Sequence, residues 1–289
     1  MKKVCVVTGG TGGIGLGAAR KMAEDYIVLI CDVNQEKIDA AVEKLRAEGG
    51  EVYGMLCDIS DKAQTDALAK RAAELGPVQG VIQLAGLTPT FAPAPSILRV
   101  DTIGPMNINE SFYEVMEAGS CILDICSSTA HFVPFDRYPV DRFALCNEDK
   151  EKFYDSMLEL VMSAPEENNM QANMAYTWSR CFIYWYARQC AAKYGREKGI
   201  RVMTVSPGII ETEMSMADLK KGGDTENFDR TMSWTALGRP GSIEEVAFLF
   251  STIIDERNSY LTGADIYFDG GADASGYRAQ REWYPSSGK

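Results

Sequence analysis

The chain has 289 residues, of which 46% are hydrophobic, and a formal net charge of −12. Because it offers no basic stripe to neutralise phosphates, a nucleic-acid or anionic-membrane partner is not expected. Its eight cysteines stand singly and it has one histidine, so we expect reduced core thiols and no metal site. The N-terminus enters an apolar strand without a cleavable signal segment and no apolar run could span a bilayer, which favours a cytoplasmic protein.

An apolar strand at Lys3–Val7 runs directly into a glycine-rich turn. Gly9, Gly13 and Gly15 would let the backbone approach a pyrophosphate, with the N-terminal amides of the next helix pointing at it. The pattern therefore predicts a dinucleotide-binding loop. A purely structural glycine corner is the alternative.

A second strand ends in Asp32, roughly 20 residues beyond the loop, where a carboxylate can accept hydrogen bonds from both hydroxyls of an adenine ribose. No arginine stands beside Asp32 or in the glycine loop, so a 2′-phosphate would be repelled. The sequence thus favours NAD(H) over NADP(H) as cofactor. The alternative is that Asp32 caps the helix that starts near Gln35.

Strand candidates alternate with helical patterns along the chain and predict an α/β fold, a doubly wound seven-stranded parallel sheet of the Rossmann type. We expect a single domain over residues 1–289, with an inserted helical lid. The strand candidates are Lys3–Val7, Ile27–Cys31, Glu51–Cys57, Gly80–Leu84, Ser120–Cys126, Gly199–Val205 and Gly263–Phe268. Further segments are an insertion at about 131–175 with one helix at Lys150–Met162, a substrate lid at about 213–235 and a C-terminal tail at 272–289.

Tyr176 is the candidate proton donor. Tyrosine holds its proton well above neutral pH, so acid/base catalysis needs a neighbouring cation to stabilise the phenolate. Arg180 follows four residues later, which is one helical turn and the same helix face. The alternative is an ordinary aromatic amphipathic helix.

A hydroxyl is expected at the same sheet edge, because the strand at Ser120–Cys126 is followed by Ser127 and Ser128. Either serine could hydrogen-bond a substrate oxygen. A plain turn after the strand is the alternative.

Together these motifs resemble the short-chain dehydrogenase/reductase family from end to end. The matching segments, in family order, are the TGxxxGIG loop at Thr8–Gly15, Asp32, Asp58 in LCDIS, Ala85 and Gly86, the serine strand, the Tyr176 helix, SPG at Ser206–Gly208 followed by Thr212, and the closing LTGADIYFDGG. The loop and the resemblance together imply cofactor contacts at Gly9, Thr11, Gly12, Gly13, Ile14, Gly15, Asp32, Val33, Asp58, Ile59, Ala85, Gly86, Tyr176, Arg180, Pro207, Gly208, Ile210 and Thr212.

The resemblance also implies a hydride transfer in which Tyr176 is the acid/base and Ser127 orients the substrate oxygen, with Ser128 as the close alternative. Arg180 stands where the family has lysine, and Asp101 where it often has an asparagine of the proton relay. The candidate catalytic set is therefore Ser127, Tyr176, Arg180 and Asp101. A guanidinium can stabilise a phenolate but stays protonated, so it should relay protons poorly. The family's usual Asn-Ala-Gly also reads Leu84-Ala85-Gly86 here.

The insertion is similar to that of bacterial hydroxysteroid dehydrogenases of the 3α-hydroxysteroid dehydrogenase/carbonyl reductase kind. Aromatic residues and methionines in the insertion and the lid suit a flat apolar substrate, and packing onto the domain or a subunit contact is the alternative. These residues are His131, Phe132, Phe135, Tyr138, Phe143, Met214, Met216, Met232 and Trp234.

The sequence thus predicts an NAD-dependent oxidoreductase that interconverts a secondary alcohol and a ketone, with a steroid or bile acid as the favoured substrate. The alternatives are a sugar, aromatic alcohol or quinone substrate, or a dinucleotide-binding protein with impaired or absent turnover. Relatives usually associate through the helix after Gly104 and the Tyr176 helix, so the resemblance implies a homodimer or homotetramer unless the insertion covers that surface.

Overall fold

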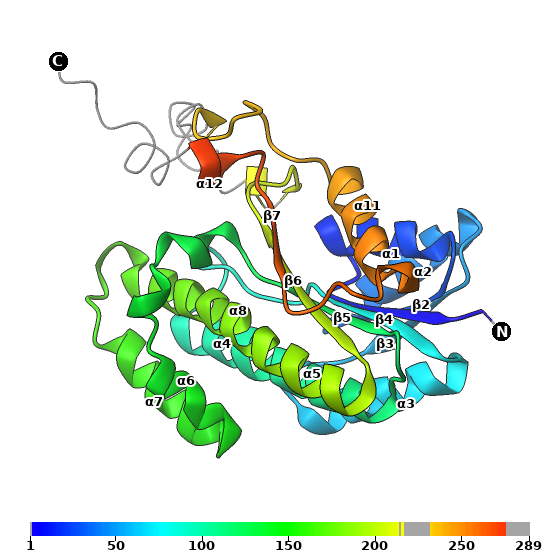
Figure 1. The fold of residues 1–289 in the computed structure, drawn as a ribbon. Coiled ribbons are helices and arrows are strands. Elements are labelled where there is room, and N and C mark those ends of the chain that lie inside the picture. Colours follow the sequence, from blue (N-terminus) through cyan, green and yellow to red (C-terminus); the bar gives the residue numbers. More distant parts are fainter. Residues whose placement is uncertain (1, 214, 217–231, 276–289) are drawn as a thin grey trace.

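The computed structural model describes residues 2–213, 215–216 and 232–275, and in this part of the chain the strands form one seven-stranded parallel sheet (Figure 1). The sheet order is β3-β2-β1-β4-β5-β6-β7. The strands are β1 (Val4–Thr8), β2 (Ile27–Asp32), β3 (Val52–Leu56), β4 (Val78–Gln83), β5 (Cys121–Ile125), β6 (Arg201–Pro207) and β7 (Asp265–Phe268). The predicted fold class is confirmed.

The central strands are apolar because both faces of the sheet are covered. Every residue of β1 and of β4 is buried, and β1 pairs with β2 on one side and β4 on the other. The strand order reverses between β1 and β4, and in open α/β sheets ligands bind at the carboxyl ends of the strands beside such a reversal. The glycine-rich turn leaves the sheet at this point.

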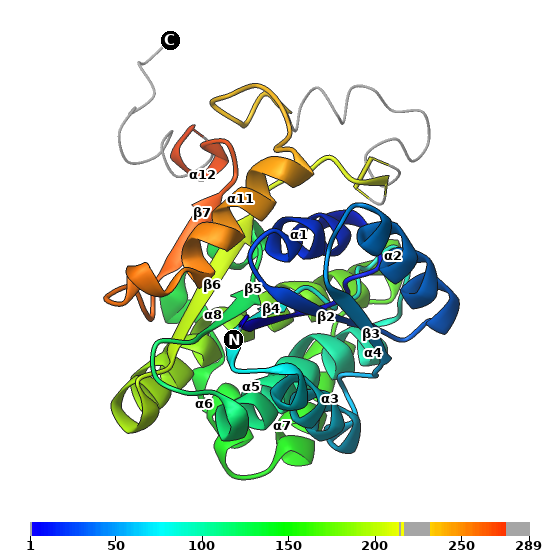
Figure 2. The same cartoon turned by 90° about the vertical axis from the view of Figure 1, so that its right-hand side faces the viewer.

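Helices form a layer on each side of the sheet (Figures 1 and 2). One layer contains α1 (Gly13–Ala23), α2 (Gln35–Ala47) and α11 (Ile243–Ile254). The other contains α3 (Lys62–Leu75), α4 (Ala94–Leu98), α5 (Gly104–Val115) and α8 (Met170–Lys198). The buried apolar side chains accordingly divide into two clusters, one on each side of the sheet.

The insertion after β5 folds mainly as short helices. They are η2 (Ser128–Phe132), η3 (Phe135–Arg137), α6 (Val140–Ala144), η4 (Leu145–Asn147), α7 (Lys150–Met162) and η5 (Glu167–Asn169). The predicted helix at Lys150–Met162 matches α7, whose first turn is capped by the Asp149 carboxylate. Phe153 of α7 is fully buried, with its ring centroid 4.5 Å from that of Phe182 in α8. The insertion thus covers part of α8, the helix that the family resemblance associates with subunit contact.

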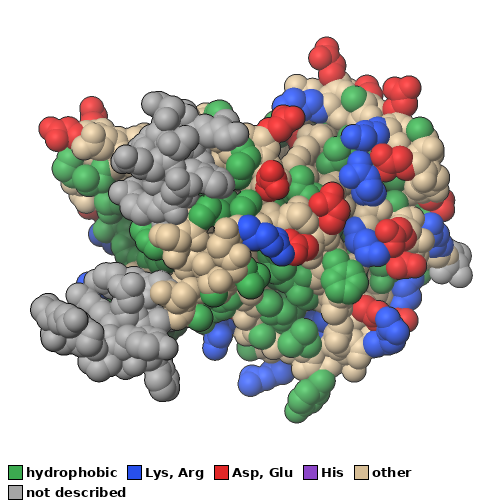
Figure 3. All heavy atoms as spheres, turned by 90° about the horizontal axis from the view of Figure 1, so that it is seen from above, with side chains coloured by type: hydrophobic (Ala, Val, Ile, Leu, Met, Phe, Trp, Pro, Cys, Tyr) green, Lys and Arg blue, Asp and Glu red, His purple; other side chains and the backbone are tan. Residues whose placement is uncertain are grey.

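The remaining described elements are η1 (Arg99–Ile103), a π-helical turn between α4 and α5, then η7 (Glu256–Asn258) and α12 (Ala272–Ser275). Of the predicted lid and tail, residues 214, 217–231 and 276–289 lie outside the described residues. Within the described ranges, no helix combines the length and apolar character needed to cross a membrane. Figure 3 shows acidic and basic side chains interspersed over the side formed by α1, α2 and α11, where Arg20 pairs with Glu48 and Arg239 with Glu245.

Candidate active site

The glycine-rich turn lies against the end of β4. Gly9 has a φ of 65°, and a Cβ at this position would come within 2.8 Å of the Ala85 backbone nitrogen, so only glycine allows this approach. The Thr8 hydroxyl accepts hydrogen bonds from the amides of Leu84 (3.2 Å) and Ala85 (3.1 Å). These contacts bring two predicted cofactor segments, the loop and Ala85–Gly86, together.

The first turn of α1 forms a cradle that fits a pyrophosphate. Gly12 is the N-cap residue and makes no side-chain capping bond, and a Cβ on Gly12 would meet no atom within 4 Å. The turn therefore combines free space with helix N-terminal amides, which attract anions. A Cβ on Gly13 would lie 3.6 Å from the Thr212 side chain, so the structure also brings Thr212 to this loop.

Asp32 ends β2 facing the same loop. Its Oδ2 accepts a hydrogen bond from the Thr11 hydroxyl at 2.6 Å, and its Oδ1 accepts one from the Val33 amide at 2.8 Å. The cap of α2 is Asn34, whose side chain accepts from the Lys37 amide. The alternative in which Asp32 caps that helix is therefore wrong.

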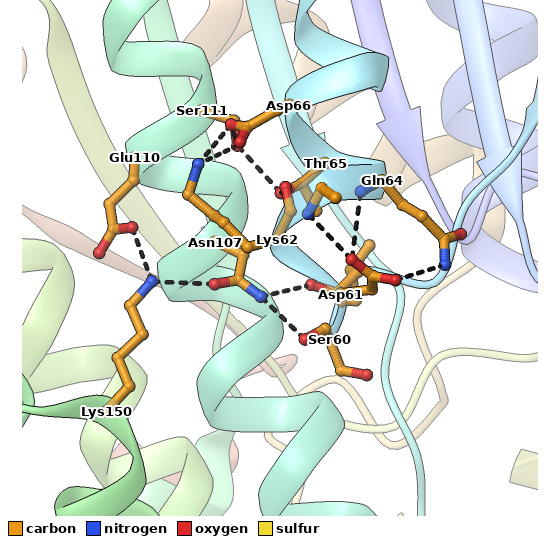
Figure 4. Close-up of polar contacts among 12 residues, drawn as sticks. Ser60, Asp61, Lys62, Gln64, Thr65, Asp66, Asn107, Glu110, Ser111 and Lys150 are labelled. Atoms are coloured by element: carbon orange, nitrogen blue, oxygen red, sulfur yellow. Dashed lines mark hydrogen bonds and ion pairs between the residues drawn. The ribbon is translucent and has the colours of Figure 1, made fainter.

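The segment after β3, which the resemblance assigns to the adenine, is held by its own polar contacts and by side chains of α3 and α5 (Figure 4). Asp58 Oδ1 accepts from the amide and the hydroxyl of Ser60, at 2.9 and 2.7 Å. The Asn107 side-chain amide in α5 donates to the carbonyls of Ile59 and Ser60, both at 3.0 Å. Lys150 of α7 then donates to Asn107 Oδ1 at 2.9 Å. Sequence reasoning missed Asn107 and Lys150, because nothing local marks a contact between such distant positions.

Tyr176 and Arg180 lie side by side on α8, as their spacing predicts. The guanidinium carbon of Arg180 is 4.7 Å from the ring centroid of Tyr176. Arg180 Nη1 donates to the Ile125 carbonyl at 3.1 Å, and Nη2 lies 2.5 Å from Asp101 Oδ2. A Cβ on Gly86 would come 3.1 Å from Nη2, so the strand-end glycine leaves room for this side chain.

Asp101 reaches this position from η1. A π-helical turn shifts the helix register by one residue, and such turns are frequent at functional sites. Besides Arg180, the Asp101 carboxylate accepts from the Leu87 amide at 2.8 Å. Burial raises the pKa of Asp101 to about 6, and the charge of Arg180 limits that rise. Burial alone would lower the pKa of Arg180, but the Asp101 carboxylate outweighs burial and raises the pKa of the guanidinium above its usual value. At neutral pH the two groups form an ion pair.

The serine segment follows β5 at the same sheet edge. Ser127 is the N-cap of η2, where its hydroxyl accepts from the Thr129 amide at 3.2 Å and donates to the Thr129 hydroxyl at 3.1 Å. Ser128 is the first residue of η2.

The predicted nicotinamide segment starts where β6 ends, at Pro207. The amide of Gly208 donates to the Phe268 carbonyl at 2.9 Å. Further along, Ile210 forms an isolated parallel bridge with Gly241.

The predicted substrate-lining residues fall into two groups. Tyr138 and Phe143 are buried and pack the insertion onto α8, as expected if these residues pack onto the domain and do not line a substrate site. Phe132, Phe135 and Trp234 keep 67%, 54% and 50% of their surfaces exposed. Met232 and His131 are buried, Met216 is partly buried, and Met214 lies outside the described residues.

Comparisons with known proteins agree with the fold. The family model described as short chain dehydrogenase matches residues 3–139, and the one described as enoyl-(acyl carrier protein) reductase matches residues 151–273. The chain therefore belongs to the short-chain dehydrogenase/reductase family, and it is an oxidoreductase of that family.

Individual relatives are distant. The 3-alpha-hydroxysteroid dehydrogenase/carbonyl reductase of Comamonas testosteroni is 27% identical over 199 residues, covering 68% of this chain and 73% of the relative. Dehydrogenase/reductase SDR family member 4 of Oryctolagus cuniculus is 27% identical over 272 residues, covering 93% of both chains. The solved structure of a short chain dehydrogenase from Burkholderia cenocepacia J2315 in complex with NADP has a TM-score of 0.72 at 22% identity, covering 94% of this chain and 98% of that one. That likeness concerns the fold.

Proposed function

We propose that this chain is an NAD(H)-dependent oxidoreductase that interconverts a secondary alcohol and a ketone on a bulky apolar substrate. The observation that carries this proposal is the contact between Tyr176 and Arg180 beside Gly86, at the sheet edge that also carries the glycine-rich cradle. A phenol held next to a permanent cation is suited to proton exchange with a substrate oxygen.

In this mechanism the dinucleotide, when bound, supplies or accepts the hydride. Tyr176 gives its proton to the ketone oxygen during reduction and takes it back from the alcohol during oxidation. Arg180 stabilises the intervening phenolate and contributes to the ribose site. Ser127 turns its hydroxyl away from Thr129 and donates to the substrate oxygen, which it thereby holds beside the Tyr176 hydroxyl.

The preference for NAD(H) is supported by Asp32. Thr11 and Val33 hold its carboxylate at the end of β2, where it can accept from the ribose hydroxyls and would repel a 2′-phosphate. NADP in the Burkholderia cenocepacia structure is a property of that protein.

A hydroxysteroid or bile acid is the favoured substrate class. Phe132, Phe135 and Trp234 offer exposed aromatic surface to a flat apolar ligand. The named activity of the Comamonas testosteroni relative points in the same direction. Sugars, aromatic alcohols and quinones are the competing substrates.

The test is oxidation of NADH and NADPH by the purified full chain with ketosteroids, sugars, aromatic ketones and quinones. We expect NADH-dependent reduction of ketosteroids, and loss of at least about a hundredfold in kcat for Tyr176→Phe, because general acid catalysis contributes at this scale. Turnover that survives Tyr176→Phe unchanged would contradict the mechanism. Reduction of sugars or quinones alone would contradict the substrate class.

One observation favours a second candidate, a dinucleotide-binding protein without turnover. Asp101 Oδ2 lies 2.5 Å from Arg180 Nη2, and its negative charge weakens the electrostatic field of the guanidinium at the phenol of Tyr176. This candidate predicts NADH binding with no turnover of any carbonyl in the wild type or in Arg180→Lys. A rise in turnover on Arg180→Lys would instead identify an enzyme slowed by its arginine.

A further inference from the structure

His131, the only histidine of the chain, lies four residues after Ser127 in η2 and forms a buried polar cluster with β6 and β7. Its Nε2 atom is 2.9 Å from Asp265 Oδ2 and 3.0 Å from Ser206 Oγ. The Ser206 hydroxyl in turn donates to Asp265 Oδ1 at 3.1 Å. The side chains of His131 and Asp265 are 7% and 5% exposed, and Ser206 is fully buried.

The same three residue types occur in serine hydrolases, but this geometry excludes that chemistry. In a hydrolase triad the histidine binds the acid through one ring nitrogen and the serine through the other. Here Nε2 faces both Asp265 and Ser206, and the serine hydroxyl is closed off from any substrate. The cluster therefore acts as a structural connection.

The positions of the hydrogens in the cluster follow from which atoms can only accept. An ionised carboxylate only accepts, so Nε2 must carry the hydrogen that bonds Asp265, and Ser206 donates its own hydrogen to the second carboxylate oxygen. A hydrogen bond to a charged group shielded from water is stronger than a neutral one. The network thus ties η2 firmly to the two neighbouring strands.

Further hydrogen bonds connect η2 to the insertion and to Ser127. The Tyr138 hydroxyl, which belongs to the insertion, donates to the Ala130 carbonyl at 2.8 Å. The amide of Ala130 donates to the Ser127 carbonyl at 3.0 Å, and the amide of Thr129 donates to the Ser127 hydroxyl at 3.2 Å. Ser127 is therefore bonded to the two residues that directly precede His131.

We propose that His131 is a positioning residue for Ser127, acting through its bond to Asp265. This rests on the proposed function, in which Ser127 holds the substrate oxygen. Without the bond to Asp265, η2 loses its connection to β7 and keeps the hydrogen bonds that the Ala130 carbonyl accepts from Tyr138 and Cys181, and the turn that Ser127 caps shifts. Ser206 remains bonded to Asp265 through Oδ1, so the following Pro207 segment keeps its place.

The kinetic test compares His131→Ala and His131→Asn, which cannot make the bond, with His131→Gln, whose longer side chain can donate to Asp265. We expect kcat for ketone reduction to fall by about tenfold or more in the first two, because displacements near 1 Å are that costly. NADH affinity should stay within about twofold, and His131→Gln should recover most of the loss.

Gln79→Ala is the matched control for lost buried hydrogen bonds. Gln79 is 4% exposed and donates to the carbonyls of Gly119 (3.0 Å) and Ile254 (3.3 Å), at the opposite end of the sheet. Gln79→Ala should lower thermal stability and leave kcat unchanged. Equal kcat losses in Gln79→Ala and His131→Ala, or no loss in His131→Ala, would overturn the positioning role.

Hydrogen exchange measured by mass spectrometry provides a readout that needs no turnover. The amides of Thr129 and Ala130, both bonded to Ser127, should exchange faster in His131→Ala and His131→Asn than in the wild type or His131→Gln. Unchanged exchange would refute the proposal even in an active enzyme. An inactive wild type with this exchange pattern would refute the proposed function while supporting the role of His131.

Discussion

Arg180 and Asp101 form a buried ion pair with 2.5 Å between Nη2 and Oδ2, and the same guanidinium lies over the ring of Tyr176. The proposed cation of the site is thus also the partner of a carboxylate. Because Asp101 carries the opposite charge beside the same guanidinium, it reduces the stabilisation that Arg180 would give a phenolate. In the proposed mechanism, the pair therefore influences how well Tyr176 exchanges its proton.

Asp101→Asn tests how the carboxylate affects Arg180. The amide oxygen can still accept from the Leu87 amide, but the guanidinium loses its counter-charge. We expect the pH profile of alcohol oxidation to move to lower pH, since the phenolate forms more easily beside an unmatched cation. We also expect the free energy of unfolding, measured with urea, to fall by roughly 3 kcal/mol, because the buried charge of Arg180 is left unpaired.

The double variant Asp101→Asn/Arg180→Lys closes a mutant cycle and restores the residue types usual in the family. If the pair acts as a unit, the stability losses of the two single variants will not add, with a coupling of about 0.5 to 3 kcal/mol. Strictly additive losses, together with an unmoved pH profile in Asp101→Asn, would show that Asp101 does not act through Arg180.

Gly12→Ala tests the cradle at the start of α1. A Cβ there meets no protein atom within 4 Å, and the extended backbone of Gly12, with φ of −158°, suits alanine. Stability should therefore change by no more than about 1 kcal/mol. If a pyrophosphate occupies this space, NADH affinity measured by fluorescence titration should fall by about tenfold or more. Gly195→Ala in α8, where the added Cβ would be in ordinary contact, is the control and should bind NADH normally.

Asp32→Ala tests cofactor choice. Removal of the carboxylate deletes the acceptor for the ribose hydroxyls and the repulsion of a 2′-phosphate. We expect NADH to bind about tenfold more weakly and NADPH to bind more tightly than it does to the wild type. Asp39→Ala removes the same charge from an exposed position of α2 and should change neither affinity. A wild type that already prefers NADPH would contradict the proposed role of Asp32.

Much of the fold could be predicted because its signals are local. Both faces of β1 are buried, so its apolar run is uninterrupted, and the glycine turn follows directly. Helix α7 has its amphipathic pattern and its Asp149 cap within one short stretch. The contact between Tyr176 and Arg180 follows from the helical period alone.

Contacts between distant positions could not be predicted in the same way. The sequence indicates Asp101 and Arg180 separately, but their direct contact depends on the π-helical turn η1. His131 meets a carboxylate 134 residues further along the chain, across the end of the sheet. The sequence predicts Phe143 near the substrate, whereas its burial against Phe182 depends on how the whole insertion folds back. Aromatic composition alone does not distinguish a pocket wall from a core.

Asp124, in the middle of β5, provides the pH dependence of folding that the structure predicts most directly. It is buried, and its carboxylate accepts from the side-chain amides of Gln83 and Asn109. Burial raises its pKa to about 7, although the bond from Asn109 stabilises the charged form. In the described part of the chain, Gln83 Oε1 and Asn109 Oδ1 are buried acceptors without a donor. Turning over the Gln83 side-chain amide would let its Oε1 accept from a neutral group that donates at position 124.

The sign of the effect follows from linkage. Because the folded pKa of Asp124 lies above the unfolded value of about 3.9, the folded state holds the proton more tightly, and this contribution to stability is lost as the pH rises toward about 7. Asp124→Asn removes the dependence and supplies a donor, so its free energy of unfolding should exceed that of the wild type by roughly 2 to 4 kcal/mol above about pH 7, and by much less near about pH 4. Urea unfolding across this range measures the difference, with the exposed Asp141→Asn as control. A constant difference at every pH would mean that Asp124 titrates no differently in the folded chain than in the unfolded one.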